Sequence, residues 1–350
     1  MSDRVDVLVV SLGTTRGLRL SDAQLVEMFR AAGAGVAAVA TSIGLTDALR
    51  RGYPVNDVVE AVAARRALRA GMRRHDPRAL VISTTTAAFL IGDPGLPFAV
   101  WLDSPARLNR PGVLNQPLHL IERRQLARAR VLMAHSPGTV RALPAGAGPS
   151  VLVPPPVPAA PAPSDVREAF AVGYTPDPKA KGLALLCAAW EQAELPDTRL
   201  LIAGIPPDRA RAFLSRRGLR LPGQTELVGM LPQPTFRDLL DRARVFVSAA
   251  EWEDFGIAPL EALDRGAALV CAPAGGPFPG LALARSLAPE FVAADRGAGS
   301  LARALRSAYA TPDDRLRAYR VAARGELAPY RPEASVARIQ AEVLPALLGS

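Results

Sequence analysis

The chain has 350 residues, of which 49% are hydrophobic, and this is enough to build two domains with separate cores. No apolar run reaches the length of a membrane-spanning helix. The polar start, Met1 to Asp6, leads straight into a strand-like run, so we expect no signal peptide. Cys187 and Cys271 lie in apolar stretches that are typical of buried thiols, not of a disulfide. These features predict a cytoplasmic protein.

Positive charge is concentrated in the first part of the chain. Residues 1–155 contain 19 arginines, no lysine and 11 acids, whereas the remainder contains 23 basic and 22 acidic residues. Arg65, Arg69 and Arg73 recur at four-residue spacing in a helix predicted over 56–74, so they share one face. Two interpretations remain open: a peripheral contact with the inner face of a membrane or with an acidic acceptor, or a solvated helix surface. We expect no nucleic-acid partner.

Strands and helices alternate along the chain, which predicts parallel sheets with helices on both faces. The expected strands are 6–11, 36–40, 80–83, 98–102, 131–136, 169–174, 199–204, 226–231, 245–248 and 268–271. The proline-rich run 154–163 is a stiff connector, and we take it as the domain boundary. The sequence therefore predicts one domain over 1–155 and a second over 164–330.

The loop after the first strand contains Gly13 and Thr14, and Ser21–Asp22 are predicted to cap the following helix. This loop lacks the spacing Gly-x-Gly-x-x-Gly, and no acid follows the second strand at the usual place. The sequence therefore gives little support to dinucleotide binding.

The most informative stretch runs from Glu251 to Leu263 and reads Glu-Trp-Glu-Asp-Phe-Gly-Ile-Ala-Pro-Leu-Glu-Ala-Leu. It follows the strand 245–248 and enters a helix predicted to begin near Phe255. A helix N-terminus offers unpaired N–H groups and partial positive charge, which suits a phosphate. Glu253 and Glu261 lie eight positions apart, too far to share a proton. They suit the two ends of one polar ligand, such as a sugar nucleotide.

This stretch resembles the Glu-x7-Glu motif of retaining glycosyltransferases of the GT-B fold, above all family 4. The segment Thr175 to Gly182 resembles the phosphate loop of that family, with Lys181 at the position of its lysine. Tyr174 stands where an arginine is common, and Lys179, the other lysine of the chain, is an alternative cation. Asp103 stands where many members have a histidine that contacts the donor sugar, while His135 is interpreted as structural.

The resemblance implies an α/β protein of the GT-B class, with two Rossmann-like doubly wound domains facing across a cleft. It also implies that the final helix, 334–350, returns to the N-terminal domain. The implied activity is transfer of a sugar from a nucleotide-diphosphate sugar to an unidentified acceptor, with retention of configuration. The acceptor can be a small molecule, a lipid-linked molecule or a glycan. No metal and no cofactor are expected, because a helix dipole and Lys181 would neutralise the diphosphate.

The resemblance assigns catalysis to Glu253, Lys181 and Asp103, and ribose binding to Glu261. The donor would also contact a further set of residues: Asp254, Phe255, Gly256, Ile257, Gly13, Thr14, Val228, Met230 and Tyr174. Two alternatives stay open. One is a GT-B sugar-nucleotide epimerase, and the other is a non-catalytic protein that binds a sugar nucleotide.

Overall fold

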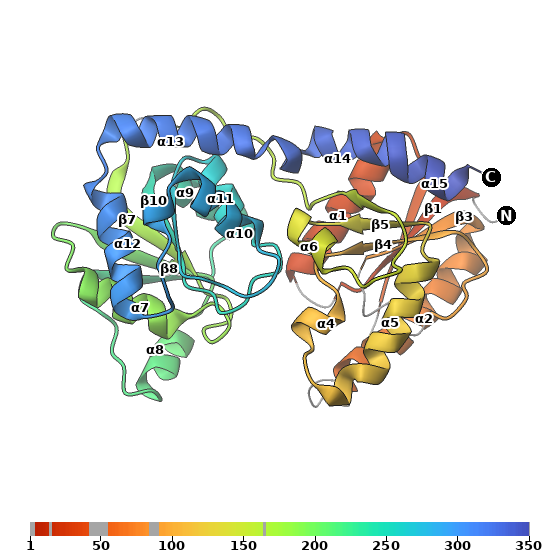
Figure 1. Ribbon diagram of the computed structural model, residues 1–350, viewed down its shortest axis with the longest axis horizontal. Coiled ribbons are helices and arrows are strands. Elements are labelled where there is room, and N and C mark those ends of the chain that lie inside the picture. Colours follow the sequence, from red (N-terminus) through yellow and green to blue (C-terminus); the bar gives the residue numbers. More distant parts are fainter. Residues whose placement is uncertain (1–3, 14–15, 42–54, 84–90, 164–165, 350) are drawn as a thin grey trace. The chain divides into compact units, whose positions relative to one another are not determined.

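The computed structural model describes residues 4–13, 16–41, 55–83, 91–163 and 166–349 (Figure 1). The chain divides into two compact units. The N-terminal unit consists of residues 1–156 together with 330–350, and the C-terminal unit consists of residues 157–329. The division falls inside the proline-rich run 154–163.

The N-terminal unit contains a parallel sheet with the strand order β2-β1-β3-β4-β5-β6. Its strands are β1 (Val5–Ser11), β2 (Val36–Ala40), β3 (Pro77–Ile82), β4 (Phe98–Leu102), β5 (Val131–Ala134) and β6 (Ser150–Leu152). The central strands β3 to β5 are nearly continuous apolar runs because helices cover both faces of the sheet. The three-residue strand β6 was not predicted from the sequence.

Two helical layers enclose this sheet. The helices are α1 (Arg16–Ala31), α2 (Val55–His75), α4 (Ala106–Asn109), η2 (Val113–Asn115), α5 (Gln116–Arg128) and α6 (Pro137–Ala142). Phe29 of α1 packs on the face that carries Val9 and Trp101. Leu68 of α2 and Leu126 of α5 pack on the opposite face.

The end of the chain completes the core of the N-terminal unit. It consists of α14 (Pro332–Arg338), a π-helical turn (Ile339–Val343) and α15 (Leu344–Leu348). Ile339, Val343 and Leu347 are buried in the same cluster as Phe29 and Trp101. This segment therefore covers the α1 face of the sheet, far in sequence from the strands that it contacts.

The C-terminal unit contains a second parallel sheet, with the strand order β11-β10-β7-β8-β9. Its strands are β7 (Glu168–Tyr174), β8 (Arg199–Ala203), β9 (Thr225–Gly229), β10 (Ala243–Ser248) and β11 (Ala268–Cys271). Its helices are α7 (Leu183–Ala193), α8 (Pro207–Ser215), α9 (Gln233–Arg242), α10 (Ile257–Asp264), α11 (Pro279–Leu287), η3 (Pro289–Phe291), α12 (Ala298–Ala310) and α13 (Asp313–Glu326), and η4 (Ala328–Tyr330) follows where the two units meet in sequence. The two doubly wound sheets confirm the predicted fold class.

One local prediction is wrong. Ser21 and Asp22 do not cap α1, because this helix begins at Arg16 and both residues are buried within it. The Asp22 carboxylate instead accepts a hydrogen bond from the Ser11 hydroxyl at the end of β1. Burial raises the pKa of Asp22 above its ordinary value. The Ser-Asp pair thus joins the helix to the strand.

No helix in the described residues is both long and apolar enough to cross a membrane.

His135 lies directly after β5 and is buried against Trp101, with the two ring centroids 4.4 Å apart. Its backbone N–H donates to the carbonyl of Leu102, 3.0 Å away. Burial disfavours the charged imidazolium and lowers the pKa of His135 to about 3. This environment is that of a packed core residue.

Stability should therefore fall in acid. Between the ordinary pKa of histidine, 6.5, and about 3, the unfolded chain binds a proton at residue 135 that the native chain does not. The free energy of unfolding should drop by about 2 kcal/mol from this group between pH 7.5 and pH 5. Urea titrations of the wild type and of His135→Gln at both pH values measure it. An equal drop in the variant would contradict the buried neutral histidine.

Candidate functional site

The order of the strands places a candidate site in the C-terminal unit. Chain order reverses between β7 and β10, which are neighbours in the sheet. In open α/β sheets, ligands bind outside the carboxyl ends of the strands at such a reversal. β7 ends at Tyr174 and β10 ends at Ser248, so the loop 175–182 and the stretch 249–256 both begin there.

The loop after β7 is closed by hydrogen bonds to the Asp177 carboxylate and between its own backbone groups. The amides of Lys179 and Ala180 both donate to the Asp177 carboxylate at 2.9 Å. The amide of Lys181 donates to the Asp177 carbonyl at 2.9 Å, and that of Gly182 donates to the Lys179 carbonyl at 3.1 Å. Because these amides are already bonded, the loop offers an anion its two lysine side chains, of which Lys179 is exposed and Lys181 is partly buried.

The two segments are locked together by close backbone packing. Gly182 has a φ of +67°, and a Cβ atom at this position would lie 2.0 Å from the carbonyl oxygen of Ala249. The amide of Glu251 donates to the carbonyl of Ala180 at 2.9 Å. The left-handed conformation and the missing side chain are therefore both required here.

Arg296, in the loop before α12, binds backbone carbonyls of the stretch after β10 and of the loop after β11. Its guanidinium donates to the carbonyls of Ala250 at 2.6 Å, Pro273 at 2.7 Å and Ala249 at 3.1 Å. Sequence reasoning missed this residue, because a carbonyl-binding arginine leaves no local motif.

An ion pair joins two of the predicted catalytic residues. Lys181 Nζ lies 2.7 Å from Glu253 Oε2, and the side chains are 25% and 14% exposed. Burial raises the pKa of Glu253, and the charge of Lys181 opposes that rise only in part. The amide of Glu253 also donates to the carbonyl of Gly275, 3.1 Å away. Lys181 thus holds the carboxylate of Glu253, and the loop after β11 holds its backbone.

The second predicted carboxylate has a partner that the sequence did not suggest. The helix α10 begins at Ile257, two residues after the predicted start, with Gly256 at a φ of +76° as its N-cap. Glu261 lies inside this helix and is 11% exposed. Arg237 of α9 donates to its Oε1 from Nε at 3.2 Å and from Nη2 at 2.8 Å. Both bonds reach the same oxygen atom.

Three residues predicted to contact the donor lie at the carboxyl ends of β7 and β9, the two strands on either side of β8. Tyr174 ends β7, and its ring lies 5.2 Å from that of Phe236. The same ring packs against Gly204, where an added Cβ would lie 2.6 Å away. The amide of Gly204 donates to Gly229, and Gly229 separates Val228 from Met230. Tyr174 is 37% exposed and Met230 is 54% exposed.

The remaining predicted residues have different surroundings. Trp252 Nε1 donates to the carboxylate of Asp254 at 2.9 Å, so Asp254 is tied to its own loop. Phe255 is buried.

Gly13 and Asp103 belong to the N-terminal unit, whereas the other predicted residues with described positions belong to the C-terminal unit. Asp103 follows β4, and its Oδ1 accepts from the amide of Ser104 at 2.7 Å. Gly13 follows β1 with a φ of +57°, and Thr14 lies outside the described residues.

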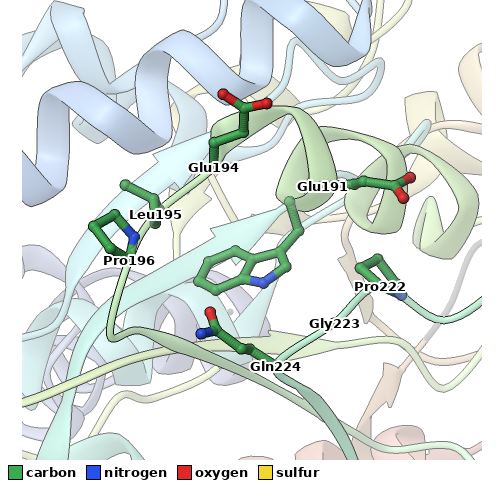
Figure 2. A pocket seen from close by; sticks show the side chains of 8 residues that line it. Glu191, Glu194, Leu195, Pro196, Pro222, Gly223 and Gln224 are labelled. Carbon is green, nitrogen blue, oxygen red and sulfur yellow. The ribbon is translucent and has the colours of Figure 1, made fainter.

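A hollow of about 300 Å³ lies elsewhere on the C-terminal unit (Figure 2). It is lined by Trp190, Glu191, Glu194, Leu195, Pro196, Pro222, Gly223 and Gln224. These residues precede β8 and β9, so the hollow opens at the amino edge of the sheet, opposite to Lys181. Its charged lining residues are carboxylates, which disfavour a phosphate, and Figure 2 shows the two carboxylates pointing apart. Among described residues, no group of three His, Cys, Asp or Glu is arranged to hold a metal ion.

Residues 164–324 match the family described as "Glycosyl transferases group 1". The match covers nearly all of the C-terminal unit, including both loops of the site, and supports a glycosyltransferase. No curated protein matches the chain.

Solved structures extend the likeness to both units. Sucrose-phosphate synthase from Thermosynechococcus elongatus is 18% identical with a TM-score of 0.74, over 95% of this chain and 96% of that one. Anabaena Alr3699/HepE, in complex with UDP and glucose, is 15% identical with a TM-score of 0.64, over 98% and 100%. An E. coli structure described as trehalose-6-phosphate bound with UDP-2-fluoro glucose is 11% identical with a TM-score of 0.68, over 97% and 99%. The fold is therefore GT-B.

The packing of Gly182 can be tested against a matched glycine. Gly218 has the same φ of +67°, but nothing lies within 4 Å of the Cβ that an alanine would add. Gly218→Ala should cost about 1 kcal/mol, which is the cost of the left-handed conformation alone. Gly182→Ala should cost at least about 2 kcal/mol more, because the Lys181 loop must move away from Ala249. Urea titrations measure both losses, and equal losses would contradict the close packing.

Proposed function

We propose that the chain is a retaining glycosyltransferase that moves a sugar from a nucleotide-diphosphate sugar to an acceptor. The observation that carries the proposal is the pairing of Lys181 with Glu253. These residues lie 72 positions apart in sequence and meet at 2.7 Å beside the strand reversal, within the segment that matches group 1 glycosyltransferases. Opposite charges at such a place suit a ligand with both phosphate and hydroxyl groups.

Lys181 would stabilise the leaving diphosphate. Negative charge develops on the phosphate as the bond to the sugar breaks, and a fixed cation lowers the energy of that state. Lys181 is held by a closed loop and by Glu253, so little reorganisation is needed during the reaction. The amide-rich start of α10 would supply further positive potential. Under this proposal no metal is required for charge neutralisation.

Glu253 would accept hydrogen bonds from hydroxyls of the donor sugar. Its carboxylate has two oxygens, and Lys181 contacts Oε2. A carboxylate that is mostly buried binds hydroxyl donors strongly because it has few water partners. Burial also raises the pKa of Glu253, so the strength of this contact depends on pH. The resemblance also proposes Asp103 as a hydrogen-bond acceptor for the donor sugar.

Glu261 would bind the ribose of the nucleotide. Arg237 bonds to Oε1 twice and leaves Oε2 as the acceptor for a ribose hydroxyl. Tyr174, Val228 and Met230 would then lie near the base. The UDP in the Anabaena structure and the UDP-2-fluoro glucose in the E. coli structure support a uridine nucleotide as the first donor to test.

The general experiment is incubation with UDP-, GDP- and dTDP-sugars and observation by NMR. A retaining transferase that lacks its acceptor should hydrolyse one donor slowly and release the anomer that the donor carried. An epimerase would produce an isomeric donor. A non-catalytic binding protein would show a raised melting temperature without turnover.

Lys181→Ala should lower the rate of donor turnover by about a hundredfold, because the leaving phosphate loses its cation. Lys181→Arg should retain more activity than Lys181→Ala. The control is Lys179→Ala, which removes the other lysine of the chain from the exposed side of the same loop. Loss of activity in Lys179→Ala, with none in Lys181→Ala, would move the role to Lys179.

Glu261→Ala should raise the dissociation constant for the donor about tenfold or more, with less effect on the rate at saturation. Glu226→Ala removes an exposed carboxylate on β9 and should leave binding unchanged. Isothermal titration with the nucleotide diphosphate measures both constants. Equal affinity of the two variants would exclude Glu261 from nucleotide binding.

A further inference from the structure

Exposed aliphatic side chains gather on one part of the N-terminal unit. Among the exposed large hydrophobic residues of the described chain, half belong to α2, η2 or α5: Val55, Val58, Val62, Val113, Leu114 and Leu120. Leu114 is 86% exposed and Val113 is 76% exposed. Side chains of this kind scattered singly need no explanation, but a group on adjoining elements marks an interaction surface.

The outer face of α2 changes from apolar to basic along its length. Val55, Val58 and Val62 recur every three or four residues, which places them on one stripe. The arginines continue the same stripe: Arg65, Arg66, Arg69 and Arg73. All four arginines are exposed, and no ion pair in the described part of the chain involves them.

The outer face of α5 repeats the pattern. Leu120 is 57% exposed, and Arg123 and Arg124 follow it on the same side of the helix. Val113 and Leu114 lie in η2, directly before the start of α5. Each helix therefore begins with exposed aliphatic groups and continues with exposed arginines.

The two apolar ends lie at the same edge of the unit. The helix α2 leads into β3 and α5 leads into β5, and these strands are parallel members of one sheet. Both helices therefore run against the strands and start at the carboxyl edge of the sheet. Ala61 of α2 is clustered with Leu118 and Ile121 of α5, so the helices are neighbours (Figure 1).

The acidic residues of α2 and α5 do not offset this charge. Asp57, Glu60 and Glu122 are at most 5% exposed. Asp57 pairs with Arg110, with Oδ2 at 3.1 Å from Nε, and Glu122 accepts from the backbone amide of Ala106 at 3.0 Å. These carboxylates are thus buried, while the exposed charged side chains of α2 and α5 are arginines. One of these arginines, Arg128 at the end of α5, pairs with the exposed Asp93 at 2.6 Å.

We propose that this face, formed by α2, η2 and α5, binds the surface of an anionic lipid bilayer. The aliphatic ends would enter the boundary of the acyl chains, and the arginines behind them would meet the lipid phosphates. A nucleic acid offers phosphates but no apolar layer for the aliphatic side chains, so a bilayer fits both halves of the face. The inference goes beyond the proposed reaction, since it assigns a location and favours a lipid-linked acceptor.

The test is sedimentation of the whole chain with vesicles. Vesicles of phosphatidylcholine with about 30% phosphatidylglycerol should bind the protein, and vesicles of phosphatidylcholine alone should bind it at least about tenfold more weakly. Binding to the anionic vesicles should decrease in about 0.5 M NaCl, because salt screens the arginines. Equal binding to both kinds of vesicle, or to neither, would overturn the proposal.

Matched variants test whether binding depends on this face or only on the overall charge and hydrophobicity of the protein. Arg66→Glu with Arg69→Glu should weaken binding at least about tenfold. The same change in the exposed arginines of α8 and its end, Arg209→Glu with Arg216→Glu, should have much less effect. Leu114→Asp should weaken binding, whereas Val321→Asp, at a site 76% exposed on α13, should not.

Two other partners, a nucleic acid and a second copy of the chain, would give different results in these experiments. Salt-sensitive binding to an RNA or DNA duplex without binding to vesicles would overturn the proposal. So would a change in oligomeric state caused by Leu114→Asp, measured by light scattering, because the aliphatic residues would then belong to a contact between copies. Circular dichroism on every variant confirms that folding is intact.

Discussion

The ion pair between Lys181 and Glu253 depends on close packing between the two backbone segments that carry these residues. One segment is the loop after β7, closed by the Asp177 carboxylate, and the other is the stretch after β10. Gly182 permits the contact because any side chain there would meet the carbonyl of Ala249. A salt bridge of largely buried groups adds little net stability, because the cost of removing both charges from water offsets their attraction. Its importance is positional, since it fixes a cation and a carboxylate at the strand reversal.

The same region shows how charge is distributed for a ligand with several polar parts. Arg237 holds one oxygen of Glu261, and Lys181 contacts one oxygen of Glu253. Each carboxylate therefore has a cation on one side, which orients it. The arrangement differs from a simple phosphate-binding loop, because the loop amides donate to the Asp177 carboxylate and to carbonyls of the same loop. The positive charge comes instead from side chains and from the start of α10.

Much of this organisation was predictable, and the limits have physical reasons. The bounds of the strands 98–102 and 268–271 were predicted correctly, because parallel strands buried on both faces are short continuous apolar runs. Glu253, Glu261 and Lys181 were identified from their motifs. Arg237 and Arg296 were not, because their partners are distant in sequence and a single arginine, on a helix or in a loop, has no distinctive pattern. The predicted helix cap at Ser21–Asp22 was wrong because the helix begins at Arg16 and the Asp22 carboxylate bonds to Ser11 in β1. Local sequence does not show such a contact between distant elements.

The path of the chain also constrains the order in which the protein can be built. The N-terminal unit receives Ile339, Val343 and Leu347 from the last residues of the chain, and these side chains cover apolar positions around Phe29 and Trp101. During synthesis, the first sheet leaves the ribosome long before its cover does, while every strand of the second sheet is already complete. The C-terminal unit can therefore fold first, while the face of the first sheet that carries α1 stays partly uncovered until the last residues of the chain are made.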